Sequence, residues 1–206
     1  MIVSLIGMSN TGKTYWAKQL ENKGFFRFSC DDYIQKKLEE ELKRGGFDGI
    51  EDVAMWMGQP FDRQYKEASK QYMSLETDAM KEIFSRIKKE KKKNIVIDTT
   101  GSIIYIDSSV LHTLRTLTTV VYFSTPPSIR KEMYQMYIKN PKPVIWGKSF
   151  FTYTNESPYD ALARCYPKFL AFRAKGYRKL AHITIDYFTL RNTSFSVDDL
   201  LSRIEV

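Results

Sequence analysis

The segment GMSNTGKT at residues 7–14 places two glycines, a lysine and a hydroxyl residue in the spacing G-x-x-x-x-G-K-[ST]. Gly7 and Gly12 permit backbone conformations and close approaches that a Cβ would obstruct. The backbone N–H groups of such a loop line a concavity around phosphate oxygens, at the start of a helix whose dipole also favours an anion. We therefore expect Lys13 to reach the β- and γ-phosphates of ATP and Thr14 to ligate Mg²⁺.

The surroundings of this motif, which is the phosphate loop or Walker A pattern, support the interpretation. An apolar run at residues 1–6 precedes it and a helical pattern at 13–23 follows it, which is the context that the motif requires. A strand-to-helix turn that ends in Lys-Thr by coincidence is the alternative. We predict that the whole loop contacts the nucleotide: Gly7, Met8, Ser9, Asn10, Thr11, Gly12, Lys13 and Thr14.

Carboxylates follow a second apolar segment, where the chain reads SCDDYI. A carboxylate at a strand end can hold Mg²⁺ through water or accept the proton of an attacking hydroxyl. Asp32 is followed three residues later by Gln35, so a helix-capping role and a catalytic role remain open for it. Asp31 has no such capping role, and we predict that it is the catalytic base.

A third apolar segment ends in VIDTTGS. An Asp after such a strand, close to a phosphate loop, is the usual partner of the Mg²⁺ ion, and we assign Asp98 to this role beside Thr14. A buried, purely structural Asp98 is the alternative. Thr99, Thr100 and Gly101 would then present hydroxyl and N–H groups beside the γ-phosphate.

Strands and helices alternate along the rest of the chain. We predict strands at 1–6, 25–29, 94–98, 119–123 and 182–186. We predict helices at 13–23, 32–42, 61–87, 108–117, 126–139, 158–175 and 197–204, the third from an apolar stripe with steps of three and four residues. This alternation indicates an α/β fold with a parallel sheet, in one domain that spans residues 1–206.

Residues 140–157, NPKPVIWGKSFFTYTNES, interrupt this regular pattern. Pro141, Pro143 and Gly147 exclude a continuous helix, yet the segment is rich in aromatic and aliphatic residues. We predict a lid that closes over the bound nucleotide and acceptor and brings Lys142 to the phosphates. A static loop that packs permanently on the body is the alternative.

The composition limits the remaining function classes. The 206 residues carry a formal charge of +8, and half of it comes from the run at residues 88–93, which we interpret as a solvated helix end rather than a nucleic-acid site. Cys30 and Cys165 are too few and too far apart for a disulfide framework or a metal cluster, so we predict two buried thiols. No apolar run approaches the roughly 20 residues of a membrane span. We expect a soluble, cytoplasmic monomer.

Several segments together resemble the shikimate kinase branch of the small-molecule P-loop kinases. GMSNTGKT is similar to that family's phosphate loop, GQPFDR at 58–63 to its G-E-x-x-F-R segment, and RAKGYRKLAHITID at 173–186 to its R-x-x-x-Y-x-x-x-A segment. The resemblance implies a P-loop three-layer sandwich, whose five parallel strands run in the order 2-3-1-4-5 with helices on both faces. It also implies that Arg63 and Arg173 hold an acceptor carboxylate, a task that suits the guanidinium group.

The chain departs from this family at four places on the acceptor side. Ser29 stands where the family has the first Asp of a D-x-D pattern, and Asp98 stands where shikimate kinases generally lack an acid. A glycine triplet is replaced by Thr99-Thr100-Gly101, and the lid offers Lys142 in place of Arg.

These features predict a kinase that transfers the γ-phosphoryl group of ATP, with Mg²⁺, to a hydroxyl of a small, anionic acceptor. Lys13 and a lid cation, Arg130 or Lys142, would neutralise the developing charge. A polynucleotide or nucleoside kinase is one alternative, because DDY after the second strand also resembles the polynucleotide kinase pattern. A nucleotide-binding protein without transferase activity is another.

Overall fold

The computed structural model describes residues 1–47, 50–90, 94–140 and 142–205. Five strands form one parallel sheet in the order β2-β3-β1-β4-β5, as the resemblance implies. The strands are β1 (Ile2–Gly7), β2 (Phe26–Ser29), β3 (Ile95–Asp98), β4 (Thr119–Phe123) and β5 (Ile183–Ile185). Their carboxyl ends therefore meet at one edge, which is where ligands bind in open α/β sheets.

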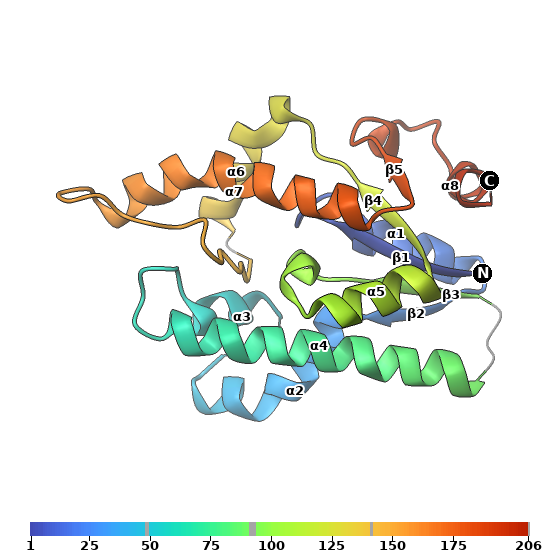
Figure 1. Ribbon diagram of the computed structural model, residues 1–206, viewed down its shortest axis with the longest axis horizontal. Coiled ribbons are helices and arrows are strands. Elements are labelled where there is room, and N and C mark those ends of the chain that lie inside the picture. The colour runs from blue at the N-terminus through green and yellow to red at the C-terminus, as the bar shows by residue number, and fades with distance from the viewer. Residues whose placement is uncertain (48–49, 91–93, 141, 206) are drawn as a thin grey trace.

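Helices cover both faces of the sheet (Figure 1). On one face, α1 (Lys13–Asn22) and α8 (Val197–Ile204) pack against β1 and β4 through Trp16, Leu20 and Leu200. On the other face, α4 (Tyr65–Glu90), α5 (Ser108–Leu117) and α7 (Pro158–Leu180) bury a larger apolar cluster. Both faces of each central strand are covered, which explains their nearly continuous apolar sequences.

A third apolar cluster lies beside the sheet, between α2 (Cys30–Arg44), α3 (Ile50–Met57) and α4. The sequence analysis did not predict α3. Val53 and Met57, four residues apart, are both fully buried in this cluster. The helix is only 8 residues long, so its apolar periodicity extends over too few turns to be recognised in the sequence.

The N-cap residue of α2 tests one of the two roles considered for Asp32, which is helix capping. Ser29 is the N-cap residue, and its hydroxyl oxygen accepts a hydrogen bond from the Asp32 backbone N–H. Asp32 therefore lies within the first turn of the helix and does not cap it. The capping interpretation of Asp32 is wrong, because the helix begins two residues earlier than the sequence pattern indicated.

Other helix boundaries also moved. The long helix α4 begins at Tyr65, and Phe61 lies in the preceding turn. The helix α7 continues to Leu180 with Pro167 inside it. Between β4 and the lid segment, a short 3-10 turn at Pro127–Ile129 leads into α6 (Arg130–Lys139).

Residues 142–157 contain neither helix nor strand and connect α6 to α7 (Figure 1). Val144, Ile145 and Trp146 are buried, whereas most of the residues from 147 to 157 are exposed. The Tyr65 hydroxyl holds the buried part, since it donates to the Val144 carbonyl and accepts from the Trp146 N–H. Pro141 and residues 91–93 of the basic run lie outside the described residues.

The remaining features agree with the composition. Cys30 and Cys165 are both buried and free. Among the described residues, no helix is both long and apolar enough to cross a membrane.

Candidate active site

The phosphate loop connects β1 to α1 and has the backbone conformations that its glycines permit. Gly7 has φ 148°, and a Cβ built on it would lie only 2.8 Å from the Phe123 carbonyl oxygen of β4. Gly12 has φ 98° and caps α1 in the left-handed region. The Thr11 hydroxyl closes the loop by donating to the Met8 carbonyl at 2.8 Å. The loop therefore needs glycine at both positions.

Lys13 begins α1 and turns its ammonium group back over the loop. Its Nζ donates to the carbonyl oxygens of Gly7 and Met8, each at 3.0 Å. Burial lowers the pKa of Lys13, while the nearby carboxylates of Asp98 and Asp31 act in the opposite direction. A buried cation beside two acids is thus fixed at the mouth of the loop.

Asp98, at the end of β3, lies beside the loop and is almost completely buried. Burial raises its pKa, and this is opposed by the charge of Lys13, a hydrogen bond from Thr14 and the charge of Arg27. Arg27 also forms an ion pair with Asp32 at 3.2 Å, so it lies between the two acids. A hydroxyl and a carboxylate side by side are the oxygen ligands that suit Mg²⁺ together with phosphates.

The strand register explains how Asp98 relates to Ser29. The two residues are direct partners in the parallel pairing of β2 with β3. Neighbouring strands lie about 4.8 Å apart. The Asp98 carboxylate therefore lies at the position adjacent to Ser29 on the next strand.

Asp31 lies one residue into α2 and faces the same region. Its Oδ1 accepts a hydrogen bond from the Tyr72 hydroxyl of α4 at 3.3 Å. Burial raises the pKa of Asp31 to about 6, and the charge of Lys13 opposes this shift. Asp32, by contrast, has a largely exposed side chain. The structure thus separates the two acids, and only Asp31 is held in a partly desolvated position.

The turn after β3 uses its hydroxyl groups within the protein. Thr99 donates to the Leu5 carbonyl at 2.7 Å. Thr100 and Ser102 donate to the two carboxylate oxygens of Glu76, a fully buried acid of α4, and the Ser102 bond measures 2.6 Å. Of the three residues that the sequence analysis selected here, Gly101 alone lines the cavity beside the phosphate loop.

That cavity measures about 330 Å³ and joins the phosphate loop to the predicted base. Its lining comes from the phosphate loop, α1, the end of β2, α2, α4, the turn after β3 and the lid segment: Ser9, Asn10, Gly12, Lys13, Thr14, Tyr15, Ser29, Asp31, Asp32, Tyr72, Gly101, Lys142 and Pro143. A nucleotide phosphate and an acceptor hydroxyl could meet within it.

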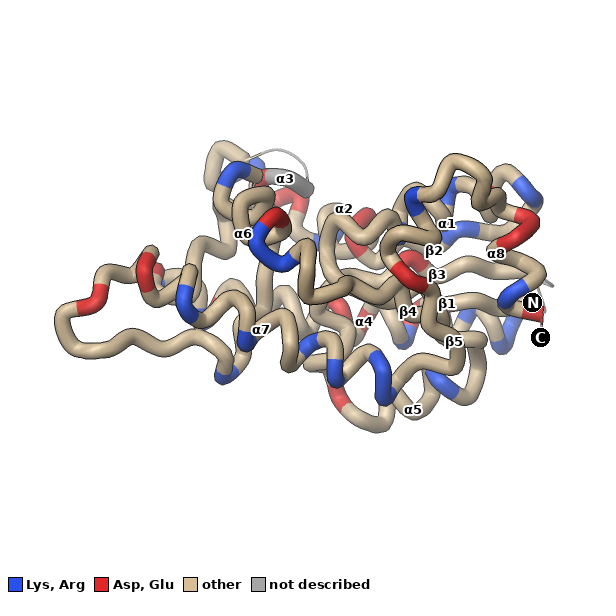
Figure 2. Tube along the Cα trace, turned by 90° about the horizontal axis from the view of Figure 1, so that it is seen from above, with Lys and Arg blue, Asp and Glu red and all other residues tan. Residues whose placement is uncertain are grey.

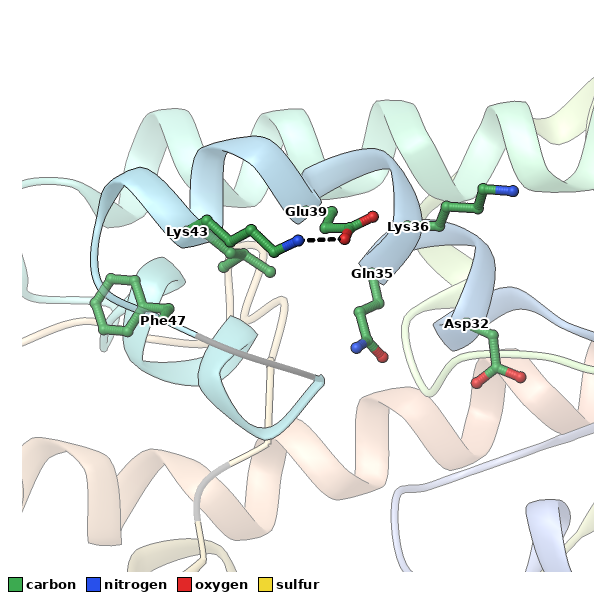
Figure 3. A pocket seen from close by; sticks show the side chains of 7 residues that line it. Asp32, Gln35, Lys36, Glu39, Lys43 and Phe47 are labelled. Carbon is green, nitrogen blue, oxygen red and sulfur yellow. Dashed lines mark hydrogen bonds and ion pairs between the residues drawn. The ribbon is translucent and has the colours of Figure 1, made fainter.

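A second cavity of about 350 Å³ lies along α2 and shares only Asp32 with the first (Figure 3). Its side chains include Gln35, Lys36 and Phe47, and Lys43 pairs with Glu39 at 2.5 Å. None of its lining residues belongs to the phosphate loop. Of these two cavities, the first is therefore the one that the phosphate loop lines.

The predicted cations differ in their placement. Lys142 lines the first cavity, and Arg173 does not. Arg173 is buried, with Nη2 donating to the Ile145 carbonyl at 2.9 Å, and it lines a small neighbouring cavity of about 30 Å³ together with Ser9, Asn10 and Lys142. Arg63 is exposed in the turn before α4, and Arg130 is half-buried at the start of α6. Neither of these two arginines is among the residues that line the cavity.

The sequence analysis missed three groups at this site. Tyr72 and Glu76 come from one face of α4, where Glu76 occurs within the apolar stripe four residues after Tyr72 and three before Ala79. Such a buried acid could have been recognised as a functional signal. Arg191, which donates to the Asn10 carbonyl at 2.8 Å, follows no recognisable pattern.

No protein-family model matches the chain, and a search of curated proteins finds no sequence relative. Solved structures do match over the whole chain. Shikimate kinase from Acinetobacter baumannii, in complex with shikimate, is 22% identical with a TM-score of 0.59, covering 99% of this chain and 90% of that one. Shikimate kinase from Bacteroides thetaiotaomicron is 16% identical with a TM-score of 0.62, covering 100% and 99%.

The chain has the shikimate kinase-like P-loop fold. Dephospho-CoA kinase from Campylobacter jejuni is also similar, at 15% identity and a TM-score of 0.50, covering 99% of this chain and 94% of that one. These neighbours act on different compounds, so the likeness establishes a small-molecule kinase fold and leaves the acceptor open.

Proposed function

We propose that the protein is a kinase that transfers the γ-phosphoryl group of ATP to a hydroxyl of a small, anionic acceptor. The observation that carries this proposal is the cavity of about 330 Å³ in which Lys13 and Thr14 lie opposite Asp31. Phosphoryl transfer depends mainly on alignment and charge stabilisation, and this cavity offers both.

The nucleotide side is formed by the phosphate loop. Backbone N–H groups and Lys13 would hold the β- and γ-phosphates, and Thr14 and Asp98 would hold Mg²⁺, which neutralises charge on the phosphates when it is bound. The Thr14 side chain lowers the pKa of the Asp98 carboxyl, and this proximity of the two groups supports the pairing.

The acceptor side is formed by Asp31, Gly101 and Arg173. Asp31 would accept the proton of the attacking hydroxyl, and a pKa of about 6 leaves it ionised at neutral pH while close enough to the working pH for efficient proton transfer. Tyr72 would orient the carboxylate. Arg173 would bind the anionic group of the acceptor, and Lys142 from the lid segment would stabilise the transferring phosphoryl group.

A screen of acceptors tests the proposal directly. The protein is supplied with ATP and Mg²⁺ and with shikimate, sugars, nucleosides or 5′-hydroxyl oligonucleotides, and ADP release is measured. We expect stimulation by a hydroxylated carboxylate or another small anion. Nucleotide binding without stimulation by any acceptor would favour a non-catalytic protein, and stimulation by oligonucleotides alone would favour a polynucleotide kinase.

A further inference from the structure

Arg173 is a buried cation for which the described residues provide no ion-pair partner. Its side chain is 2% exposed, and its Nε has no hydrogen-bond partner. The guanidinium group faces the rings of Phe169 at 4.3 Å and Tyr105 at 5.3 Å, and no carboxylate in the described part of the chain lies within 4.0 Å of it. A buried charge is strongly destabilising unless other charges compensate for it.

The carboxylate of Glu76 can compensate for this charge, because a single turn, residues 100–102, separates it from the guanidinium group of Arg173. It is 0% exposed and binds Thr100 and Ser102, the residues on either side of Gly101. A Cβ built on Gly101 would lie 3.1 Å from Arg173 Nη1. The Thr100–Ser102 turn is thus in contact with the guanidinium group on one side and with the Glu76 carboxylate on the other.

Other charged and titratable groups around Glu76 come from the helices α1, α2, α4 and α7 and do not replace Arg173 in this role. Lys13 belongs to α1, and Asp31 and Cys30 belong to α2, of which Asp31 repels the Glu76 carboxylate. Tyr72 shares α4 with Glu76, and Tyr177 lies beside Arg173 on α7. Lys13 is the other cation of this set, and its ammonium group is bound to the phosphate loop.

Glu76 also changes its charge near neutral pH. Burial raises its pKa to about 7, against the hydrogen bonds from Ser102 and Thr100 and the attraction of Arg173. A modest change in the surrounding charge would therefore alter its protonation.

We propose that Glu76 is the counter-ion of Arg173 while the acceptor site is empty, and that it takes up a proton when an anion binds to Arg173. This proposal rests on the proposed function, in which Arg173 receives the anionic group of the acceptor. The incoming anion neutralises the guanidinium group, so the ionised Glu76 loses its compensation and faces a second negative charge.

The direction of the pH dependence follows from linkage. Anion binding raises the pKa of Glu76 above its pKa in the empty site. Binding is therefore accompanied by proton uptake at pH values between these two pKa values. The affinity for an anion should therefore fall as the pH rises above about 7. The fall should reach up to about tenfold per pH unit.

The first experiment needs no acceptor. The carboxyl carbon of Glu76 is titrated by NMR in glutamate-labelled protein, with Glu76→Gln to assign the signal. In Arg173→Met the titration midpoint should rise by about one pH unit or more. Arg178→Met, which removes an exposed arginine of the same helix, should leave the midpoint unchanged. Arg173→Gln retains hydrogen-bond donors and replaces the Met variant if that variant does not fold.

The second experiment measures proton uptake by calorimetry. The protein is saturated with a non-hydrolysable ATP analogue so that the phosphate loop is occupied, and shikimate or sulfate is titrated at about pH 8 in buffers with different ionisation heats. The wild type should take up protons in proportion to binding. Glu76→Gln should bind without proton uptake and with an affinity independent of pH, whereas the exposed-site variant Glu67→Gln should match the wild type.

An unchanged Glu76 midpoint in both folded Arg173 variants would overturn the counter-ion assignment. Binding without proton uptake in the wild type, or no binding that depends on Arg173, would overturn the ligand-linked step. The acceptor screen is independent of both measurements. Loss of the proposed function would appear there as absent ADP release, even if the Glu76 midpoint responds to Arg173.

Discussion

At the scale of single residues, Lys13 supports the assignment of the phosphate site most directly. Its ammonium group is buried and bonded only to loop carbonyls within the described contacts. We expect Lys13→Ala to abolish ATP turnover while leaving the fold intact, because the side chain serves the phosphates rather than the core. ADP release and thermal unfolding measure the two effects. Lys18→Ala, an exposed position on the same helix, should be active.

The pair Asp31 and Asp32 makes a second residue-scale prediction. Asp31→Asn should lower kcat by about two to four orders of magnitude, because the neutral amide cannot accept the proton of the acceptor hydroxyl. Asp32→Asn should retain most of the activity, since the Asp32 side chain is largely exposed. Steady-state kinetics with the acceptor found in the screen provide the comparison. A larger loss for Asp32→Asn would show that the roles are reversed.

The raised pKa of Asp31 also predicts how stability depends on pH. A carboxyl group whose pKa is higher in the folded state than its unfolded value of about 3.9 stabilises the fold only while it is protonated. This contribution is present below about pH 4 and is lost as the pH rises through about 6. Asp31→Asn should thus be more stable than the wild type by about 1–2 kcal/mol at about pH 8, and similar at about pH 4, by urea unfolding.

Sequence reasoning performed unevenly at this scale. The phosphate loop and Asp98 could be recognised because local spacing and strand context determine their positions. Glu76 and Tyr72 were not recognised. An acid within an apolar helix stripe is a signal that the sequence contains, but the groups that Glu76 and Tyr72 contact depend on how α4 packs against α2 and the turn after β3, which are tertiary contacts.

At the scale of elements, the sequence predicted all five strands and their alternation with helices, because strands covered on both faces have continuous apolar sequences. It missed α3 and misplaced the starts of α2 and α4 and the end of α7. The helix α3 is short, and the boundaries of the other helices depend on single capping residues or on packing against neighbours.

The lid segment supports a prediction at this scale. Residues 144–146 are already buried and held by Tyr65 and Arg173, whereas most of residues 147–157 are exposed. We expect an ATP analogue and the acceptor together to slow hydrogen exchange in the exposed part and to change Trp146 fluorescence, measured after replacing Trp16 and Trp56 by Phe. Equal exchange across 142–157 with and without ligands would instead identify a fixed loop.

At the scale of the whole molecule, basic and acidic residues are interspersed in the described part of the chain. Figure 2 shows Lys and Arg positions spread along the trace with Asp and Glu among them. A protein that neutralises many phosphates loses affinity steeply with salt. We expect binding of a 5′-hydroxyl oligonucleotide to be weak and to change little between about 50 and about 200 mM salt, measured by fluorescence anisotropy. A steep salt dependence would revive the polynucleotide alternative.

The pairing of Ser29 with Asp98 has a consequence for how proteins of this fold should be compared. An acidic group that is absent from one column of an alignment can be present in a distant column and still lie at nearly the same place beside the phosphate loop. A residue-by-residue comparison would record a loss at 29 and an unrelated gain at 98. Spatial superposition would record an acidic group at one place in the sheet, whichever of the two paired strands carries it.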